Sequence, residues 1–241
     1  MLISLIIPTY NEKDNIKPLL SEIQKLGLKD YEIIFVDDSS PDGTGELISA
    51  EARKNPAIRL IKRPAKQGLG SAYFQGMSKA NGNFIITMEA DFLVGLSAIK
   101  QIIFELESGV HFVLGSRYIK GGSSNVFWLK RVGSRIINLI SGWYLGISIK
   151  DPSFALRGIR RDVFKKIKGQ ITFFGHPDFF IQESFLAYKA SGGKVKEIPV
   201  TFTSRIHGQS KVAHLFGAGF KCLAALHKIK RSWFDSAVPL N

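Results

Sequence analysis

The sequence contains a single cysteine and no apolar run long enough to cross a membrane. With Cys222 alone, the chain cannot build an internal disulfide framework or a cysteine-rich zinc site, which suits a reducing compartment. A membrane-spanning helix needs roughly 20 apolar residues, and the longest candidate, 136–149, is shorter and is interrupted by polar residues and glycines. Residues 1–7 are apolar but lack a basic leader and a cleavage site, so we expect a strand there, not a signal peptide.

Acidic residues are also few. The chain has 20 Asp and Glu against 33 Lys and Arg, and its net charge of +13 predicts an anionic partner. It shows no helix-turn-helix, zinc-finger or aromatic ribonucleoprotein signature, which disfavours nucleic acid. Apolar patches between the basic clusters favour a membrane surface that carries phosphorylated lipid. The two clusters without an acid are Arg117, Lys120, Lys130, Arg131 and Arg135, and Arg205, Lys211, Lys221, Lys228, Lys230 and Arg231.

The first half of the chain alternates between strand and helix patterns. A chain of 241 residues with 45% hydrophobic content can form one large core, or one domain with an appendage. Continuous apolar runs separated by helical stretches predict buried strands of a parallel sheet, and hence an α/β fold. The predicted strands are 2–7, 31–37, 58–62, 83–88 and 110–116, and the predicted helices are 13–27, 43–54, 68–80 and 95–107.

The second half is less regular. There we expect an apolar helix near 129–147, a strand near 153–157, a helix near 179–191 and a strand near 195–203. From residue 212, apolar residues recur at helical spacing while basic residues fall on another face. We therefore predict a main domain over 1–211 and a C-terminal amphipathic helix over 212–241 that associates with a membrane. Packing of that helix into the core is the alternative interpretation.

Three acidic clusters each follow a predicted strand. Glu12 follows 2–7, Asp37 lies at the end of 31–37, and Glu89 with Asp91 follows the strand that ends at residue 88. In open parallel sheets the ligand binds beyond the carboxyl ends of the strands, where the strand order reverses. Carboxylates that meet there repel one another unless a cation joins them. The pattern predicts a metal-bound nucleotide.

The residues around these clusters resemble a known family. The segments 5–12 (Leu-Ile-Ile-Pro-Thr-Tyr-Asn-Glu) and 36–44 (Val-Asp-Asp-Ser-Ser-Pro-Asp-Gly-Thr) resemble the opening of family 2 glycosyltransferases of the GT-A fold, a Rossmann-like nucleotide-diphospho-sugar transferase fold with a mostly parallel sheet. The segment 115–118, Arg131 and the segment 205–211 are similar to the dolichol-phosphate mannose synthase branch. The resemblance spans residues 2 to about 215, with the motifs in order.

For the nucleotide, Tyr10 could stack on the base, Glu12 could accept a base N–H and Asp37 could accept the ribose hydroxyls. Asp38 would then hold the turn 39–44. The alternative to nucleotide binding at the first strand end is that Asn11 or Asp14 caps the next helix. The loop 66–70 is equally consistent with a nucleotide contact and with an ordinary turn. The nucleotide-binding positions implied by the resemblance are Pro8, Tyr10, Glu12, Asp37 and Ala90.

Glu89 and Asp91 stand where the family carries its Asp-x-Asp metal motif. Two carboxylates two residues apart at a strand end point to the same side and can chelate Mg²⁺ or Mn²⁺ together with the diphosphate. Asp91 is also a catalytic candidate. The chain departs from the family at Glu89, at Leu93, where a glutamine ligand is usual, and at 94–95, which replace His-Pro. These departures favour an alternative, a catalytically silent paralogue that binds nucleotide or lipid.

The acceptor side matches the family more closely. The resemblance assigns the acceptor phosphate to Arg117, Arg131, Ser153, Arg205 and Lys211, with Arg117 and Arg131 also catalytic candidates. Four cations in one cleft would repel one another, which predicts an anion there, although solvation at the surface is the usual role of a lone arginine. A phosphate monoester has a second pKa of about 6, so such an acceptor is nucleophilic without a general base.

The resemblance implies metal-dependent, inverting transfer of a hexose, foremost mannose from GDP-mannose, to dolichyl or another polyprenyl phosphate. The expected location is peripheral, on the cytoplasmic face of a membrane, with a membrane-embedded partner or a further membrane segment as a possible companion. UDP-glucose or another nucleotide sugar is the alternative donor. The silent paralogue is the rival from another class, and a nucleic-acid binder ranks third.

Overall fold

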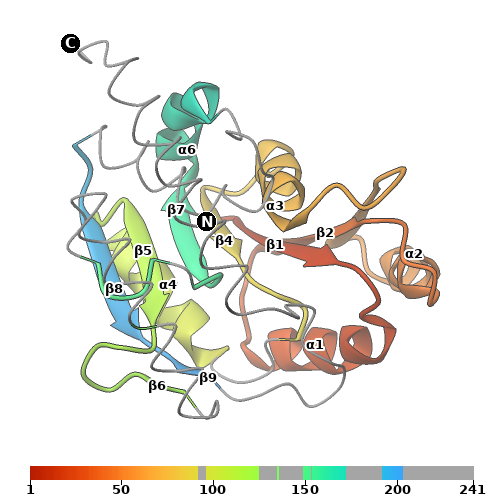
Figure 1. Cartoon of the computed structure of the whole chain (residues 1–241), viewed down its shortest axis with the longest axis horizontal. Helices are drawn as coiled ribbons and strands as arrows, with labels where there is room; N and C mark the ends of the chain where they lie inside the picture. The colour runs from red at the N-terminus through yellow and green to blue at the C-terminus, as the bar shows by residue number, and fades with distance from the viewer. Residues whose placement is uncertain (92–95, 125–134, 136–148, 153, 172–191, 203–241) are drawn as a thin grey trace.

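The computed structural model describes residues 1–91, 96–124, 135, 149–152, 154–171 and 192–202 (Figure 1). Its strands are β1 (Ile3–Thr9), β2 (Tyr31–Asp37), β3 (Ile58–Lys62), β4 (Phe84–Thr87), β5 (Phe112–Ser116), β6 (Ser123–Ser124), β7 (Arg157–Arg160), β8 (Val195–Pro199) and β9 (Thr201–Phe202). Its helices are α1 (Lys13–Lys25), α2 (Thr44–Lys54), α3 (Leu69–Ser78), α4 (Ser97–Glu107), α6 (Arg161–Ile167) and the 3-10 helix η1 (Lys168–Gln170).

Seven strands form one mostly parallel sheet in the order β3-β2-β1-β4-β7-β5-β8. In the described part of the chain, β7 alone runs against its neighbours, pairing antiparallel with both β4 and β5. The strand order reverses beside β1, because β2 and β3 are added on one side of it and β4 on the other. The predicted α/β class with a mostly parallel sheet is confirmed. Open sheets of this class bind ligands where the strand order reverses, so the candidate site lies beyond β1 and β4.

Helices cover both faces of this sheet, as Figure 1 shows. Successive strand residues face opposite sides, so Leu5 and Ile7 of β1 pack in one core with α1, α2 and α4. Ile6 lies between them in sequence and packs in the other core with α3 and α6. The strands that carry the acidic clusters are buried on both faces, which explains why their sequences read as continuous apolar runs.

Two glycines allow the closest contacts between helices and sheet. A Cβ at Gly76 of α3 would lie 2.4 Å from Cγ2 of Ile6, and one at Gly158 of β7 would lie 2.2 Å from Cγ2 of Ile102. Real Cβ atoms do not approach other atoms so closely. The absence of a side chain at these positions therefore sets the packing distance of α3 and of α4.

The second half differs from the sequence-based prediction in several places. The strand expected near 153–157 is β7, four residues later and antiparallel, and the strand expected near 195–203 is divided between β8 and β9, which belong to different sheets. Strand β6, helix α6 and the 3-10 helix η1 were not predicted. The helices predicted near 129–147 and 179–191, and the segment 212–241, lie outside the described residues. Within the described residues, no helix combines the length and the apolar character that crossing a bilayer requires.

Candidate functional site

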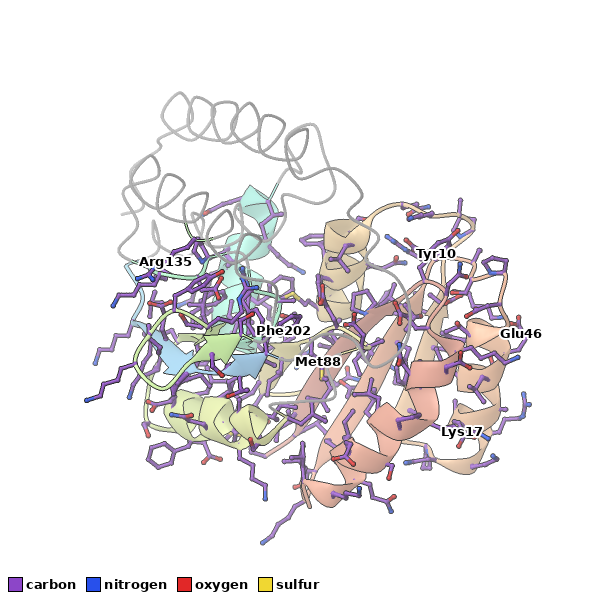
Figure 2. The ribbon with its side chains drawn as sticks, turned by 60° about the horizontal axis from the view of Figure 1, so that its bottom comes forward. Tyr10, Lys17, Glu46, Met88, Arg135 and Phe202 are labelled. Carbon is purple, nitrogen blue, oxygen red and sulfur yellow. The ribbon has the colours of Figure 1, made fainter. Side chains whose placement is uncertain are left out.

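The acidic clusters lie at neighbouring strand ends. β1 pairs with β2 on one side, where Thr9 is opposite Asp37, and with β4 on the other. The backbone N–H of Met88 donates to the carbonyl of Ile6 at 3.1 Å, which places the residues after β4 beside the end of β1. In Figure 2, Met88 is labelled near the middle of the view and Tyr10 to its right. The convergence of three acid-bearing ends on one edge is confirmed.

Asp37 holds the turn that follows β2. Its buried carboxylate accepts hydrogen bonds from the hydroxyl of Thr9 at 2.9 Å, and from the backbone N–H of Ser40 at 3.0 Å and the Ser40 hydroxyl. Ser39 has a φ of 54°, a conformation that side chains other than glycine adopt rarely. The prediction that Asp38 holds this turn is wrong. Binding of ribose by Asp37 stays a prediction.

Asp38 instead clamps the loop before α3. Its carboxylate pairs with Nε of Arg63 and accepts the N–H of Gln67 at 3.2 Å, and both charged side chains are buried. Arg63 also donates to the hydroxyl of Ser71 at 2.6 Å and to the carbonyl of Gly68 at 2.9 Å. The loop 66–70 is thus fixed against the end of β2, beside the candidate nucleotide site.

Tyr10 and Glu12 begin the connection from β1 to α1. Nζ of Lys66 lies 4.4 Å from the centre of the Tyr10 ring, so a cation from the clamped loop covers the ring that was predicted to stack on a base. Glu12 accepts a hydrogen bond from the Asn15 amide at 2.7 Å. Glu12 is the N-cap residue of α1 and makes no side-chain capping bond; the N–H of Lys13 is taken by the carboxylate of Asp42.

Glu89 and Asp91 lie two and four residues after the end of β4 and are both half-buried, whereas Ala90 between them is buried. Burial, together with the charges of Glu89 and Asp91, raises the pKa of the Tyr73 hydroxyl well above its usual value, while Arg157 opposes the shift. Both carboxylates therefore act on one buried group. No third Asp, Glu, His or Cys completes a metal cluster within the described residues. Two carboxylates fit a hard divalent cation whose other ligands are oxygens of the bound substrate.

Arg157 of β7 lies opposite Thr87, the last residue of β4, in the antiparallel pairing of these two strands. Its guanidinium is buried and donates to the backbone carbonyl of Phe154 at 2.7 Å and to that of Pro152. Burial lowers its pKa to about 10, although the charges of Tyr73 and Asp151 act in the opposite direction. The structure places Arg157 as a buried residue that holds the backbone of residues 152–154 beside the candidate site.

Arg117 follows β5 and is paired with a buried aspartate. Its Nε and Nη2 donate to the two carboxylate oxygens of Asp151 at 2.8 and 2.9 Å. Burial would lower the pKa of Arg117, but the hydrogen bonds and charge of Asp151, aided by the charge of Glu89, raise it. Asp151 therefore balances the charge of Arg117, so Arg117 does not need the external anion that was predicted for the four cations. The pairing of Asp151 with Arg117 was not predicted from the sequence.

The other predicted acceptor residues, Arg131, Ser153, Arg205 and Lys211, lie outside the described residues, as does Leu93. Arg135 of the first basic cluster is described and exposed. The assignments of the acceptor phosphate to these positions stay predictions.

A mostly parallel sheet with an acidic pair beside the reversal of strand order is the arrangement that the sequence predicted for a GT-A nucleotide-sugar transferase. The family model of glycosyl transferase family 2 matches residues 4–168. The chain belongs to this family and is a glycosyltransferase.

Two named relatives are similar over most of the chain. Polyprenol monophosphomannose synthase of Mycolicibacterium smegmatis is 32% identical over 214 residues, which make up 87% of this chain and 80% of the relative. Dolichol-phosphate mannosyltransferase of Pyrococcus furiosus is 34% identical over 218 residues, 88% of this chain but 59% of the relative.

Solved structures confirm the GT-A fold. Glucosyl-3-phosphoglycerate synthase of Mycobacterium tuberculosis, in complex with Mn²⁺, UDP-glucose and phosphoglyceric acid, superimposes with a TM-score of 0.66. The match covers 95% of this chain and 80% of that one at 16% identity, so it establishes the fold alone.

Proposed function

We propose that the protein transfers mannose from GDP-mannose to dolichyl or another polyprenyl phosphate. The observation that carries this proposal is the similarity of nearly the whole chain to two enzymes named for polyprenol- and dolichol-phosphate mannose synthesis. The juxtaposed strand ends and the paired Arg117 supply a donor side and an acceptor side consistent with it.

The donor binds beyond β1, β2 and β4 in this proposal. The nucleotide contacts Pro8, Tyr10, Glu12, Asp37 and Ala90 at these three strand ends. Glu89 and Asp91 would hold Mg²⁺ or Mn²⁺, and a bound cation there would neutralise the negative charge that develops on the departing nucleoside diphosphate. A base that stacks on Tyr10 has to displace Lys66 from one face of the ring or use the other face.

The acceptor phosphate binds at Arg117 with the predicted companions Arg131, Ser153, Arg205 and Lys211. One of its oxygens attacks C1 of the sugar as the bond between C1 and the diphosphate oxygen breaks, and the bonding electrons leave with the nucleoside diphosphate. A single displacement of this kind inverts the configuration at C1. The acceptor oxygen carries no proton that must be removed, because the second pKa of a phosphate monoester is about 6.

We propose that this reaction takes place on the cytoplasmic face of a membrane, with the protein bound peripherally. The net charge of +13 and the lipid nature of the proposed acceptor support this location. A membrane-embedded partner, or a membrane segment beyond this sequence, would keep the acceptor within reach.

A transfer assay tests the proposal. The protein is incubated with radiolabelled GDP-mannose or UDP-glucose, a short-chain polyprenyl phosphate, and Mg²⁺ or Mn²⁺, and label in the lipid extract is counted. We expect transfer of mannose that requires a divalent cation and is lost in Asp91→Asn. Transfer from UDP-glucose alone would reassign the donor. Nucleotide binding without transfer under any condition would favour the silent paralogue, which Glu89 and Leu93 support as departures from the family sequence.

A further inference from the structure

The guanidinium of Arg117 is held in one orientation by a single carboxylate. Besides the two side-chain bonds from Nε and Nη2, the backbone N–H of Arg117 donates to Oδ2 of Asp151 at 3.0 Å. Paired N–H donors on both oxygens of a carboxylate fix the plane of the guanidinium as well as its position. Asp151 is fully buried and the Arg117 side chain is 15% exposed, so water competes little for these bonds.

Aromatic rings restrict the same group from other directions. The guanidinium carbon lies 5.1 Å from the ring centre of Tyr118, 5.0 Å from that of Phe154 and 5.8 Å from that of Phe202. Phe154 and Phe202 meet edge to face at 5.9 Å, which fixes the two rings relative to each other. Arg117 therefore cannot turn away from Asp151 without losing both its ion pair and its ring contacts.

Asp151 is in turn held by Glu197 of β8. A carboxylate oxygen of Glu197 accepts the backbone N–H groups of Lys150 and Asp151, each at 3.1 Å. Glu197 lies opposite Leu114 in the pairing of β8 with β5, and β5 ends one residue before Arg117. Hydrogen bonds thus link Arg117 to Asp151 and Asp151 to Glu197. The pairing of β8 with β5 joins Glu197 to the strand that precedes Arg117.

One edge of the Arg117 guanidinium is not bonded to Asp151. Nε and Nη2 are used on Asp151, and Nη1 makes no hydrogen bond to any of the residues that the structure describes. Because Asp151 balances the charge of Arg117, the pair as a whole attracts an anion weakly at long range. What Arg117 can still give a phosphate is a directed, charge-assisted hydrogen bond from the remaining edge.

We propose that Asp151 is a positioning residue, which fixes the guanidinium of Arg117 so that its Nη1 edge is presented to the phosphate of the acceptor. This proposal rests on the proposed function in assigning the acceptor phosphate to Arg117. A directed donor contributes to transfer by orienting the attacking phosphate, and such orientation is lost when the donor can rotate. Glu197 contributes indirectly, because its carboxylate accepts the backbone N–H of Asp151 and so holds Asp151 in place.

The variant Asp151→Asn distinguishes a positioning role of Asp151 from a purely electrostatic role, because the two roles predict opposite effects on phosphate binding. Removal of the carboxylate leaves Arg117 with an uncompensated positive charge, so if charge alone mattered, a phosphate would bind more tightly. If Asp151 positions Arg117, we expect the KM for a polyprenyl phosphate to rise or the rate of transfer to fall by about 10- to 100-fold. The affinity for GDP, measured by calorimetry, should not change, because the donor contacts are elsewhere.

Nitrogen-15 NMR gives a readout that does not depend on transfer. In the wild type, the Nε–H of Arg117, assigned with Arg117→Lys, should exchange slowly with water and shift when geranyl phosphate is added as a probe. In Asp151→Asn, exchange should be fast and the probe should bind more weakly. If wild-type protein transfers no sugar but the probe still binds in this Asp151-dependent way, the proposed function fails and the positioning proposal stands.

Controls distinguish positioning from general destabilisation. Glu105→Gln removes another acid that pairs with β8, through Lys196 at 2.7 Å, and should leave both readouts unchanged. In an Arg117→Met background, Asp151→Asn should cause no further loss of transfer or of probe binding. If Asp151→Asn does not fold, Glu197→Ala is the second variant and should show a smaller loss in the same direction. Tighter probe binding, or an undiminished effect in the Arg117→Met background, would overturn the proposal.

Discussion

Glu89 reaches one methylene further than an aspartate, and it acts electrostatically on both Tyr73 and Arg117. Asp91, two residues later, acts on Tyr73 as well, so the pair is placed to share one cation at the end of β4. If the pair binds that cation, Mg²⁺ or Mn²⁺ should tighten GDP binding in calorimetry, and Asp91→Asn should abolish the gain. Glu89→Asp, which restores the usual family residue, should keep it. Equal GDP affinity with and without metal would contradict this assignment.

Glu32 is a buried acid at the opposite edge of the sheet. It accepts hydrogen bonds from the Ser4 hydroxyl, the Asn81 backbone N–H and Arg59, each at 2.6 Å. Burial would raise its pKa, but these bonds and the charge of Arg59 outweigh burial and hold the pKa below the usual 4.5. Glu32→Gln should therefore lower the free energy of unfolding by about 1–3 kcal/mol near neutral pH, measured by urea denaturation.

The pH dependence of that loss follows from the sign of the pKa shift. A carboxylate with a lowered pKa in the folded state contributes stability above the unfolded pKa, and the contribution is lost as the pH falls through the folded pKa. Between about pH 6 and pH 3.5, the wild type should therefore lose more stability than Glu32→Gln. Glu22→Gln, which removes an exposed pair with Lys25, is the control and should change stability by less than about 0.5 kcal/mol. Parallel pH curves for wild type and Glu32→Gln would contradict the expectation.

The neighbouring residues Asp37 and Asp38 have different partners, which could not be predicted from the sequence. Both are acids at the end of one strand, and the family motif identifies the pair without showing which structural role each residue has. Asp37 holds the turn at Ser40, and Asp38 holds Arg63, which is 25 residues further along the chain. Long-range partners of this kind follow from the pairing of β2 with β3, and that register cannot be derived from a single acidic dipeptide.

At the scale of elements, Gly158 sets how closely α4 lies on β7. A methyl group there would meet Cγ2 of Ile102 at 2.2 Å and Cδ1 of Leu106 at 3.0 Å, and both side chains are fully buried. Overpacking of this kind costs about 1–3 kcal/mol, so Gly158→Ala should lower the free energy of unfolding by that amount in urea denaturation. Gly169→Ala is the control, because nothing lies within 4 Å of the added methyl group. Equal stabilities would show that α4 can move away at no cost.

The elements that the sequence predicts well are those with a strong local period. Strands β1 to β5 and helices α1 to α4 lie within a few residues of their predicted bounds, because buried parallel strands are continuous apolar runs. Helix α6 was missed because its seven residues are mostly charged and bury only Phe164 and Ile167. The division of the last predicted strand was also missed. It occurs at Val200, which bonds to Ser116 and Ser123, and such partners are set by tertiary structure.

At the scale of the whole molecule, the parallel order of β2, β1 and β4 was enough to bring the proposed donor residues together. The proposed acceptor side is assembled differently, because Arg117, Asp151 and Glu197 come from segments 34 and 46 residues apart. Strand β7, inserted antiparallel between β4 and β5, separates the strand that carries the acidic pair from the strand that leads to Arg117. The sequence could indicate both halves through family motifs, but it could not show that Arg117 is already paired.

The charge of the whole chain leads to a last prediction, binding to anionic membranes. Burial of a few large apolar side chains contributes roughly 1.5–3 kcal/mol each, and each Lys or Arg near an anionic surface adds about 1 kcal/mol. The sum gives reversible binding, so cosedimentation with vesicles that contain phosphatidylserine should be strong at low salt and fall as salt is added. Phe216→Ser with Leu223→Ser, in the segment predicted to associate, should weaken binding without unfolding the protein. Phe104→Ser on α4, where the ring is 64% exposed, is the matched control and should bind as the wild type does. If the double variant unfolds and wild-type protein ignores the vesicles, that segment packs in the core and the membrane proposal fails.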